Sequence, residues 1–255
     1  MRRTRCPVWW SWSSRDAPAG PRGRDGPAVV TGVPALTAIE GIARIGLVPV
    51  VEIPDRRSAV PLAIALRRTG LVCIEITFRT PAAAEAIRAI RTECPDLLVG
   101  AGTVLTPGLV DAALAAGAGF LVAPGFNPSV VEHALDAGAT ILPGVCTPTE
   151  IEAAMARGLR HLKFFPAEAC GGTAFLRAIH APYPSLEFVP TGGISSVNLA
   201  EYLSLPNVIA CGGSWMVQRD LLVAGDFDAI ERLAAEAMAL VAAARSRPAL
   251  AATEG

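Results

Sequence analysis

The sequence contains very little lysine and almost no net charge. Lys163 is the single lysine among 22 lysine and arginine residues, which face 23 acidic residues for a formal net charge of −1. This balance leaves no basic surface to neutralise phosphates, so a nucleic-acid partner is not expected. A codon bias toward arginine would explain the scarcity of lysine, but it does not explain why one lysine remains.

Long apolar runs and clustered cysteines are also absent. The most membrane-like stretch, residues 97–126, has Asp111 as its single charge, yet glycines and prolines interrupt it repeatedly. A spanning helix is therefore not expected, and neither is a membrane partner. The six cysteines form no CxxC pair and have no histidine nearby at metal-ligand spacing. This pattern is typical of reduced thiols in a cytoplasmic protein, and we expect no metal and no other cofactor.

The first 27 residues differ in composition from the rest of the chain. They are rich in arginine, serine, proline and glycine, and they hold three of the four tryptophans. Their apolar stretch at residues 7–12 is too short for a secretory signal peptide. We expect residues 1–27 to be a disordered extension, or the product of a start codon placed too far upstream. Residues 28–245 should form one domain, with a tail at 246–255.

Apolar, β-branched runs recur at intervals of 21 to 26 residues after residue 28, and a helix-period, alanine-rich segment fills each interval. The runs begin near residues 47, 71, 97, 119, 140, 161, 187 and 208. Strands that alternate with helices predict parallel βαβ units, and eight units in about 200 residues predict an α/β fold, a single (β/α)8 TIM barrel. A doubly wound open sheet is the alternative. We also expect an extra N-terminal helix at 35–45 and a closing helix at 227–244.

Several of the expected helices carry recognisable start signals. Four begin with a polar residue followed by proline, which fits the first helical position because its missing N–H has no partner there. These pairs are Thr80-Pro81, Thr106-Pro107, Asn127-Pro128 and Thr147-Pro148. Glu150 would complete a capping box with Thr147.

Charged residues inside the expected strands are informative, because barrel strands are covered on both faces and should be apolar. Side chains alternate along a strand, so Glu75 and Arg79 share one face and should point into the barrel. Lys163 shares a face with Phe165 in the run at 161–165. One interpretation is an ion pair between Lys163 and Glu75 that only holds the barrel together.

The other interpretation makes Lys163 an amine nucleophile. Burial and a nearby guanidinium such as Arg79 both disfavour the ammonium form, and a free amine attacks carbonyl groups. Glu75 would then be the general acid and base, and Arg79 would bind a carboxylate through two hydrogen bonds. Thr103, at the end of the run GAGT, would add a hydroxyl to the same carboxylate site.

Two glycine-rich turns follow the last two expected strands, at residues 191–194 (TGGI) and 211–214 (CGGS). Glycines allow backbone N–H groups to approach an anion, and these two loops are the usual phosphate site of a TIM barrel. The alternative is that both segments are tight turns and nothing more.

Six segments resemble the 2-keto-3-deoxy-6-phosphogluconate (KDPG) aldolase family, whose members often also act on 4-hydroxy-2-oxoglutarate (KHG). They are EITFRT (75–80), GAGTV (100–104), PGVCTPTE (143–150), LKFFPAEACGG (162–172), PTGGI (190–194) and GGSW (212–215). The resemblance runs from about residue 33 to 244, and FFPAE is its most specific motif.

The resemblance implies a role for each matching residue. Lys163 would form the Schiff base, Glu75 would transfer protons through a water, and Arg79 and Thr103 would bind the pyruvyl carboxylate. Pro124 and Phe165 would line the pocket, while Gly192, Gly193, Gly213 and Ser214 would hold the substrate phosphate. The resemblance also implies a homotrimer that needs no metal.

The expected function is therefore that of a class I aldolase, which cleaves KDPG to pyruvate and glyceraldehyde 3-phosphate. KHG, which would give pyruvate and glyoxylate, is a second candidate substrate. Alternatives are an aldolase for the galactonate epimer, a non-catalytic sugar-phosphate-binding barrel, or an isomerase of phosphorylated intermediates. Some positions depart from the usual family pattern and leave the substrate preference open. They are Glu52, Pro54, Asp55, Phe78, Ala123 and Cys146.

Overall fold

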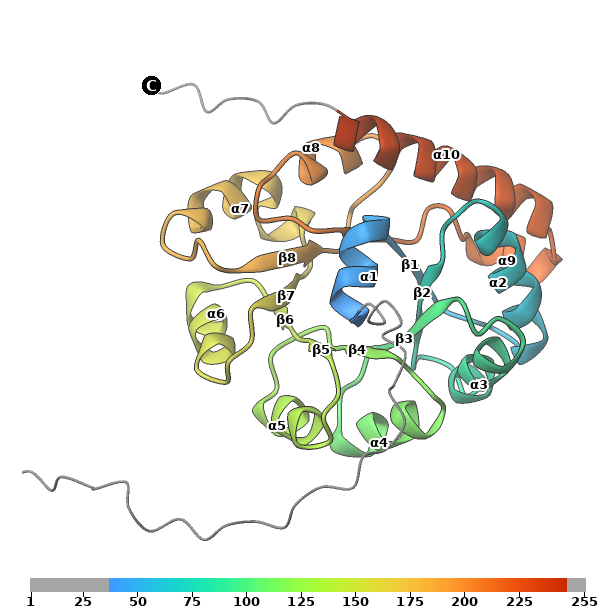
Figure 1. Ribbon diagram of the computed structural model, residues 1–255, viewed down its shortest axis with the longest axis horizontal. Coiled ribbons are helices and arrows are strands. Elements are labelled where there is room, and N and C mark those ends of the chain that lie inside the picture. Colours follow the sequence, from blue (N-terminus) through green and yellow to red (C-terminus); the bar gives the residue numbers. More distant parts are fainter. Residues whose placement is uncertain (1–36, 247–255) are drawn as a thin grey trace, which may run out of the picture. The chain divides into compact units, whose positions relative to one another are not determined.

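Parallel strands alternate with helices throughout residues 37–246, which are the residues that this computed structural model describes (Figure 1). The strands are β1 (Leu47–Val51), β2 (Cys73–Thr77), β3 (Leu98–Gly102), β4 (Phe120–Val122), β5 (Ile141–Leu142), β6 (Gly144–Val145), β7 (His161–Phe164), β8 (Glu187–Pro190) and β9 (Cys211–Gly213). The α-helices are α1 (Ala38–Ile45), α2 (Ala59–Arg68), α3 (Ala83–Glu93), α4 (Pro107–Ala115), α5 (Pro128–Asp136), α6 (Pro148–Met155), α7 (Gly172–His180), α8 (Leu199–Leu203), α9 (Arg219–Ala224) and α10 (Phe227–Ser246).

The predicted terminal segments lie mostly outside these residues. The extension expected at 1–27 and the domain start expected at 28 are not among the described residues, and neither are residues 247–255 of the expected tail. The closing helix expected at 227–244 is observed as α10, and the extra N-terminal helix expected at 35–45 is observed as α1 from Ala38.

The strands form a six-stranded sheet in the order β5-β4-β3-β2-β1-β9 and a three-stranded sheet in the order β6-β7-β8. Every pairing is parallel, as predicted. The run predicted to begin near residue 140 is divided into β5 and β6 by Pro143, whose carbonyl accepts a hydrogen bond of 2.9 Å from the Lys163 N–H. Two isolated parallel bridges, Phe188 to Val208 and Thr191 to Gly212, link the β8 segment to the β9 segment.

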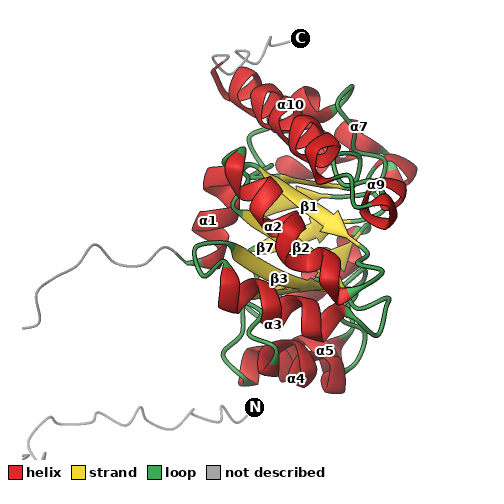
Figure 2. Cartoon of the chain, turned by 90° about the vertical axis from the view of Figure 1, so that its right-hand side faces the viewer, coloured by secondary structure: helices red, strands yellow, loops and turns green. Residues whose placement is uncertain are grey.

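Helices flank the strands, with α2, α3 and α10 on the outside of the six-stranded sheet (Figure 2). Three of the four predicted caps are confirmed, because Thr106, Asn127 and Thr147 each accept a hydrogen bond from the first turn of a helix that begins with proline. The fourth is wrong. Helix α3 begins at Ala83, and the Thr80 hydroxyl instead donates to the Ile53 carbonyl at 2.7 Å, which ties the β2–α3 loop to the end of β1.

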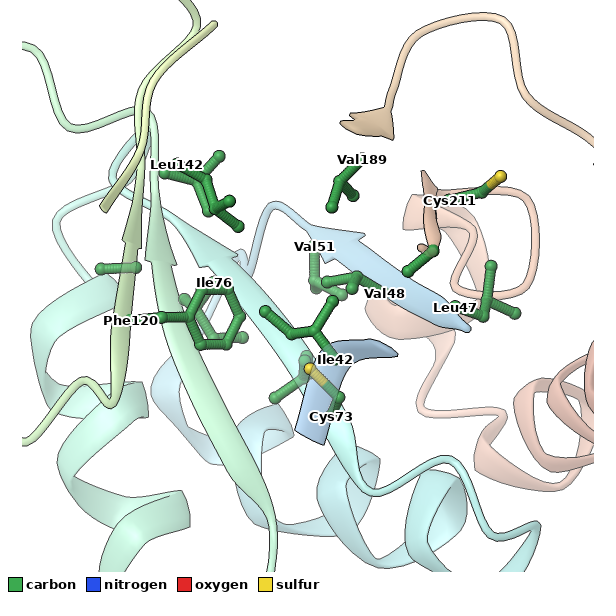
Figure 3. Packing of buried hydrophobic residues seen from close by; sticks show 14 of the residues in the cluster. Ile42, Leu47, Val48, Val51, Cys73, Ile76, Phe120, Leu142, Val189 and Cys211 are labelled. Atoms are coloured by element: carbon green, nitrogen blue, oxygen red, sulfur yellow. The ribbon is translucent and has the colours of Figure 1, made fainter. Parts of the chain in front are cut away.

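The space between the strands is filled by apolar side chains from β1 to β9, including Val48, Phe120, Leu142 and Val189 (Figure 3). The Phe120 ring occupies the place of a side chain at Gly100, where a Cβ would overlap it. Within residues 37–246, no helix has both the length and the apolar character needed to cross a membrane.

Candidate active site

Strands β2 and β7 bring Glu75 and Lys163 together from opposite sides of the strand interior. The Lys163 Nζ and the Glu75 Oε1 are 3.7 Å apart, and the side chains are only 7% and 4% exposed. Gly102, on the neighbouring strand β3, provides the necessary room, because a Cβ at this position would overlap the Glu75 carboxylate. The alternation read from the sequence therefore places both ionisable groups in the interior.

The two groups are close but not directly hydrogen-bonded. Among the described residues, the Glu75 Oε1 is buried without a hydrogen-bond partner. The pair borders an inner cavity of about 10 Å³, the volume that one water molecule requires. Its walls are Val48, Glu75, Phe120, Val122, Leu142, Lys163, Val189 and Thr191. A charge pair in such apolar surroundings is costly for stability, so this arrangement is a candidate for function rather than for structural support.

Arg79 and Thr103, which follow the carboxyl ends of β2 and β3, form a polar pair at the mouth of the interior. The Arg79 Nε donates a hydrogen bond of 3.2 Å to the Thr103 hydroxyl. Thr103 has a φ of 58°, a left-handed conformation that costs a β-branched residue about 1–3 kcal/mol. Within residues 37–246, it is the only residue other than glycine with a positive φ. Backbone strain at this position therefore presents the threonine hydroxyl to the guanidinium.

Three of the predicted glycines border an outer cavity of about 680 Å³. Gly192 and Gly193 follow β8, but Gly213 lies within β9, so the turn predicted at residues 211–214 is largely a strand instead. The Thr191–Gly212 bridge holds the turn after β8 beside β9. Gly192 and Gly193 have φ values of 98° and 82°. A Cβ on Gly193 would overlap the Glu168 side chain, and one on Gly213 would overlap the Trp215 ring. Packing within the protein thus requires glycine at both positions, whatever ligand they hold.

The outer cavity collects most of the predicted binding residues. Its walls are Val50, Glu52, Arg79, Phe165, Thr191, Gly192, Gly193, Ile194, Gly213, Ser214, Trp215, Val217, Gln218, Arg219 and Leu222. Thr191 borders the inner cavity as well, so the two cavities are neighbours. The Phe165 ring lies between the outer cavity and the inner pair, because it borders the outer cavity and its centroid is 5.1 Å from the Lys163 Nζ.

Two predicted residues do not line either cavity. Thr103 reaches the site through its hydrogen bond with Arg79. Pro124 lies beyond β4, and its carbonyl packs so closely on Gly144 that a Cβ there would overlap it.

Some wall residues escaped the sequence analysis. The sequence predicts Thr191 only as the first residue of a turn, although it borders both cavities. Glu52 stands out in the sequence as an unusual acidic residue, but nothing local identifies its partner Arg219, which lies far away along the chain. The alternation of β1 could have identified Glu52, since it follows Val48 and Val50 on the face that borders the cavities.

Nearby thiols are held in the neutral form. Burial, followed by the charge of Glu75, raises the pKa of Cys73 well above its usual range. Burial and the charge of Glu150 raise the pKa of Cys146 to about 11. Because a neutral thiol is a poor nucleophile, neither cysteine competes with Lys163 for that role. In the part of the chain that the structure describes, no group of three or more His, Cys, Asp or Glu side chains is placed to hold a metal ion.

Residues 38–233 match the aldolase family described as KDPG and KHG aldolase. A 2-dehydro-3-deoxy-phosphogluconate aldolase from Treponema pallidum is 52% identical over 206 residues, which cover 81% of this chain and 98% of that protein. A KHG/KDPG aldolase from Escherichia coli K12 is 44% identical over 203 residues, covering 79% of this chain and 95% of the relative.

A solved structure extends this comparison to the fold. The KDPG aldolase from Legionella pneumophila, with pyruvate captured as a covalent carbinolamine intermediate, aligns with a TM-score of 0.76 and 38% identity. The alignment covers 78% of this chain and 97% of that one. On these similarities, the chain belongs to the KDPG and KHG aldolase family.

Proposed function

We propose that this chain is a class I aldolase that cleaves KDPG to pyruvate and glyceraldehyde 3-phosphate through a Schiff base on Lys163. The observation that carries the proposal is the buried Lys163 Nζ, 3.7 Å from a carboxylate with an unsatisfied oxygen. Membership of the aldolase family supports the same chemistry. Arginine, the chain's other strongly basic residue type, keeps its proton and cannot form an imine.

The reaction begins with attack of the Lys163 amine on the C2 carbonyl of the substrate. The resulting carbinolamine loses water and becomes an iminium ion, which attracts electrons from the C3–C4 bond. Glu75, directly or through a water, removes the proton of the C4 hydroxyl, and the C3–C4 bond breaks to release the aldehyde. The enamine that remains is protonated at C3 and hydrolysed to pyruvate, which regenerates the amine.

The residues around the pair supply binding. Arg79 and Thr103, already joined by a hydrogen bond of 3.2 Å, bind the C1 carboxylate. Phe165, whose ring centroid lies 5.1 Å from the Lys163 Nζ, flanks the pyruvyl part. A similar role for Pro124 rests on the family resemblance alone, because Pro124 borders neither cavity. Gly192, Gly193, Gly213 and Ser214 hold the phosphate in the outer cavity, whose volume of about 680 Å³ is ample for a six-carbon sugar acid phosphate.

The same site suits KHG as a second substrate, as the name of the E. coli relative suggests. An aldolase for the galactonate epimer remains the alternative, but the solved structure described as KDPGal is only 28% identical to this chain. A barrel that binds sugar phosphates without reaction would have no use for the Lys163–Glu75 pair.

We also propose that the two sheets form one closed (β/α)8 barrel. This is supported by the short break at Pro143 between β5 and β6, and by the bridges between the β8 and β9 segments. A homotrimer in the cytoplasm completes the proposal. The described cysteines are all free, in keeping with a reducing compartment, and a designed cage of symmetric oligomeric domains aligns with a TM-score of 0.71.

Borohydride trapping with pyruvate tests the chemistry. Reduction should fix a pyruvyl group on Lys163, detected by peptide mass spectrometry, and the chain's single lysine leaves only the N-terminal amine as a second target. Lys163→Arg keeps the positive charge but should lose both trapping and more than about 10⁴-fold in kcat/KM. Trapping on the N-terminus alone, or full turnover in Lys163→Arg, would overturn the mechanism.

A further inference from the structure

Glu52 occupies a place in the outer cavity that the proposed reaction does not use. Strand β1 presents Val48 to the inner cavity and Val50 to the outer one, and Glu52, the residue after the strand, also borders the outer cavity. Val50 pairs with Glu75 in the parallel register. Glu52, two residues further along the same face, therefore lies on the mouth side of the Lys163–Glu75 pair.

Arg219, the first residue of α9, forms an ion pair with the Glu52 Oε1. The Glu52 and Arg219 side chains are 36% and 60% exposed, respectively, and both border the outer cavity. A pair this exposed contributes only about 0–1 kcal/mol to folding, so stability is a weak reason for a carboxylate on a cavity wall. Because Arg219 engages one oxygen, the carboxylate keeps further acceptor sites for a ligand.

The charged side chains of the outer cavity distinguish the two ends of a substrate. Arg79 is bound to Thr103 and is assigned to the C1 carboxylate, while Arg219 is balanced by Glu52. The wall near Glu52 therefore offers hydrogen-bond acceptors without excess positive charge. Hydroxyl groups can donate to the Glu52 oxygen that Arg219 leaves free, whereas a carboxylate in the same place would face that oxygen directly. The phosphate of KDPG is assigned to Gly192, Gly193, Gly213 and Ser214, beyond the hydroxyls.

We infer that Glu52, held by Arg219, is a specificity-determining residue that favours aldols with hydroxyls beyond the cleaved bond over aldols with a second carboxylate there. The inference rests on the proposed function. KDPG has hydroxyls on C4 and C5 before its phosphate, whereas KHG has a carboxylate at C5. Glu52 therefore selects KDPG over KHG.

The test is the ratio of kcat/KM for KHG to kcat/KM for KDPG in the purified full chain. Glu52→Gln removes the charge but keeps an acceptor, so the ratio should rise about tenfold, mainly through faster KHG cleavage. Glu52→Val also removes the acceptor and keeps the apolar pattern of β1, so KDPG cleavage should slow as well and the ratio should rise further. Glu52→Asp keeps the charge and should stay within about twofold of the wild type.

Asp55→Asn is the matched control. Asp55 also follows β1 and also pairs with an arginine, Arg57, but it lies outside the cavity. The control should leave the ratio unchanged. If Glu52→Gln and Glu52→Val keep the wild-type ratio while pyruvate is still trapped on Lys163, the Glu52–Arg219 pair only attaches α9 to the end of β1 and the inference is wrong. If the wild type itself fails to trap pyruvate, the proposed function is what fails.

Discussion

The inner and outer cavities share Thr191 but differ in how they are built. The inner one, of about 10 Å³, is enclosed by strand side chains and holds the buried Lys163–Glu75 pair. The outer one, of about 680 Å³, is bordered mainly by residues at and beyond strand ends, with Arg79, Ser214 and Arg219 exposed. The reactive groups thus lie within strands, and the recognition residues lie mainly at and beyond the strand ends. This division predicts that changes to the inner pair affect turnover, whereas changes to the outer wall affect binding and selectivity.

The largest effect after loss of the lysine is expected for Glu75→Gln. An amide cannot transfer protons, so kcat for KDPG should fall by about 10²–10⁴-fold while KM changes little. Glu187→Gln is the control, because Glu187 also lies on a strand and faces a basic side chain, His161, at 3.0 Å, but outside both cavities. Steady-state kinetics of both variants checks this. A Glu75→Gln enzyme with wild-type kcat would break the assignment of chemistry to the inner pair.

Arg79→Ala should have an intermediate effect, on pyruvate binding rather than on turnover. Loss of a hydrogen-bonded cation typically costs about 1.5–3 kcal/mol, which corresponds to a rise of about 10- to 100-fold in the pyruvate concentration needed for half-maximal trapping. Trapping at saturating pyruvate should remain. Arg67→Ala removes a surface arginine paired with Asp96 and should change nothing. Unchanged pyruvate affinity in Arg79→Ala would remove this residue from the carboxylate site.

The smallest effect concerns the glycine turn. Gly193→Ala places a Cβ at a φ of 82° against Glu168, which adds crowding to backbone strain, so it should lower the free energy of unfolding by about 2–4 kcal/mol and raise the KM for KDPG. Gly138→Ala, at a φ of 69° with open space around it, should lose only about 1–2 kcal/mol. Urea unfolding of both variants gives the comparison. Equal losses would mean that Glu168 yields to the new methyl group without cost.

The residues of the inner cavity could be predicted from the sequence more completely than those of the outer cavity. Lys163 and Glu75 stand out because ionised residues are rare within apolar strands, and the period of two fixes which way they point. The parallel alternation of strands and helices, three helix caps and both terminal helices followed from equally local patterns.

Features that depend on distant contacts could not be read in this way. Thr80-Pro81 has the sequence of a cap, but the Thr80 hydroxyl finds a better acceptor at Ile53 on another strand end. The left-handed Thr103 is set by its surroundings, since nothing local favours this conformation for a β-branched residue. The Glu52–Arg219 pair joins two residues that are 167 positions apart in the sequence, so only the fold reveals it.

Thr191 has a consequence for how such an enzyme could diversify. Its side chain fills the space left by Gly212, where a Cβ would overlap it, and among the described residues it alone borders both the inner and the outer cavity. Loops can therefore be exchanged to admit new aldehydes without disturbing the strands, except at this junction. Libraries for altered substrate scope should keep residues 191 and 212 fixed and vary the outer wall around them.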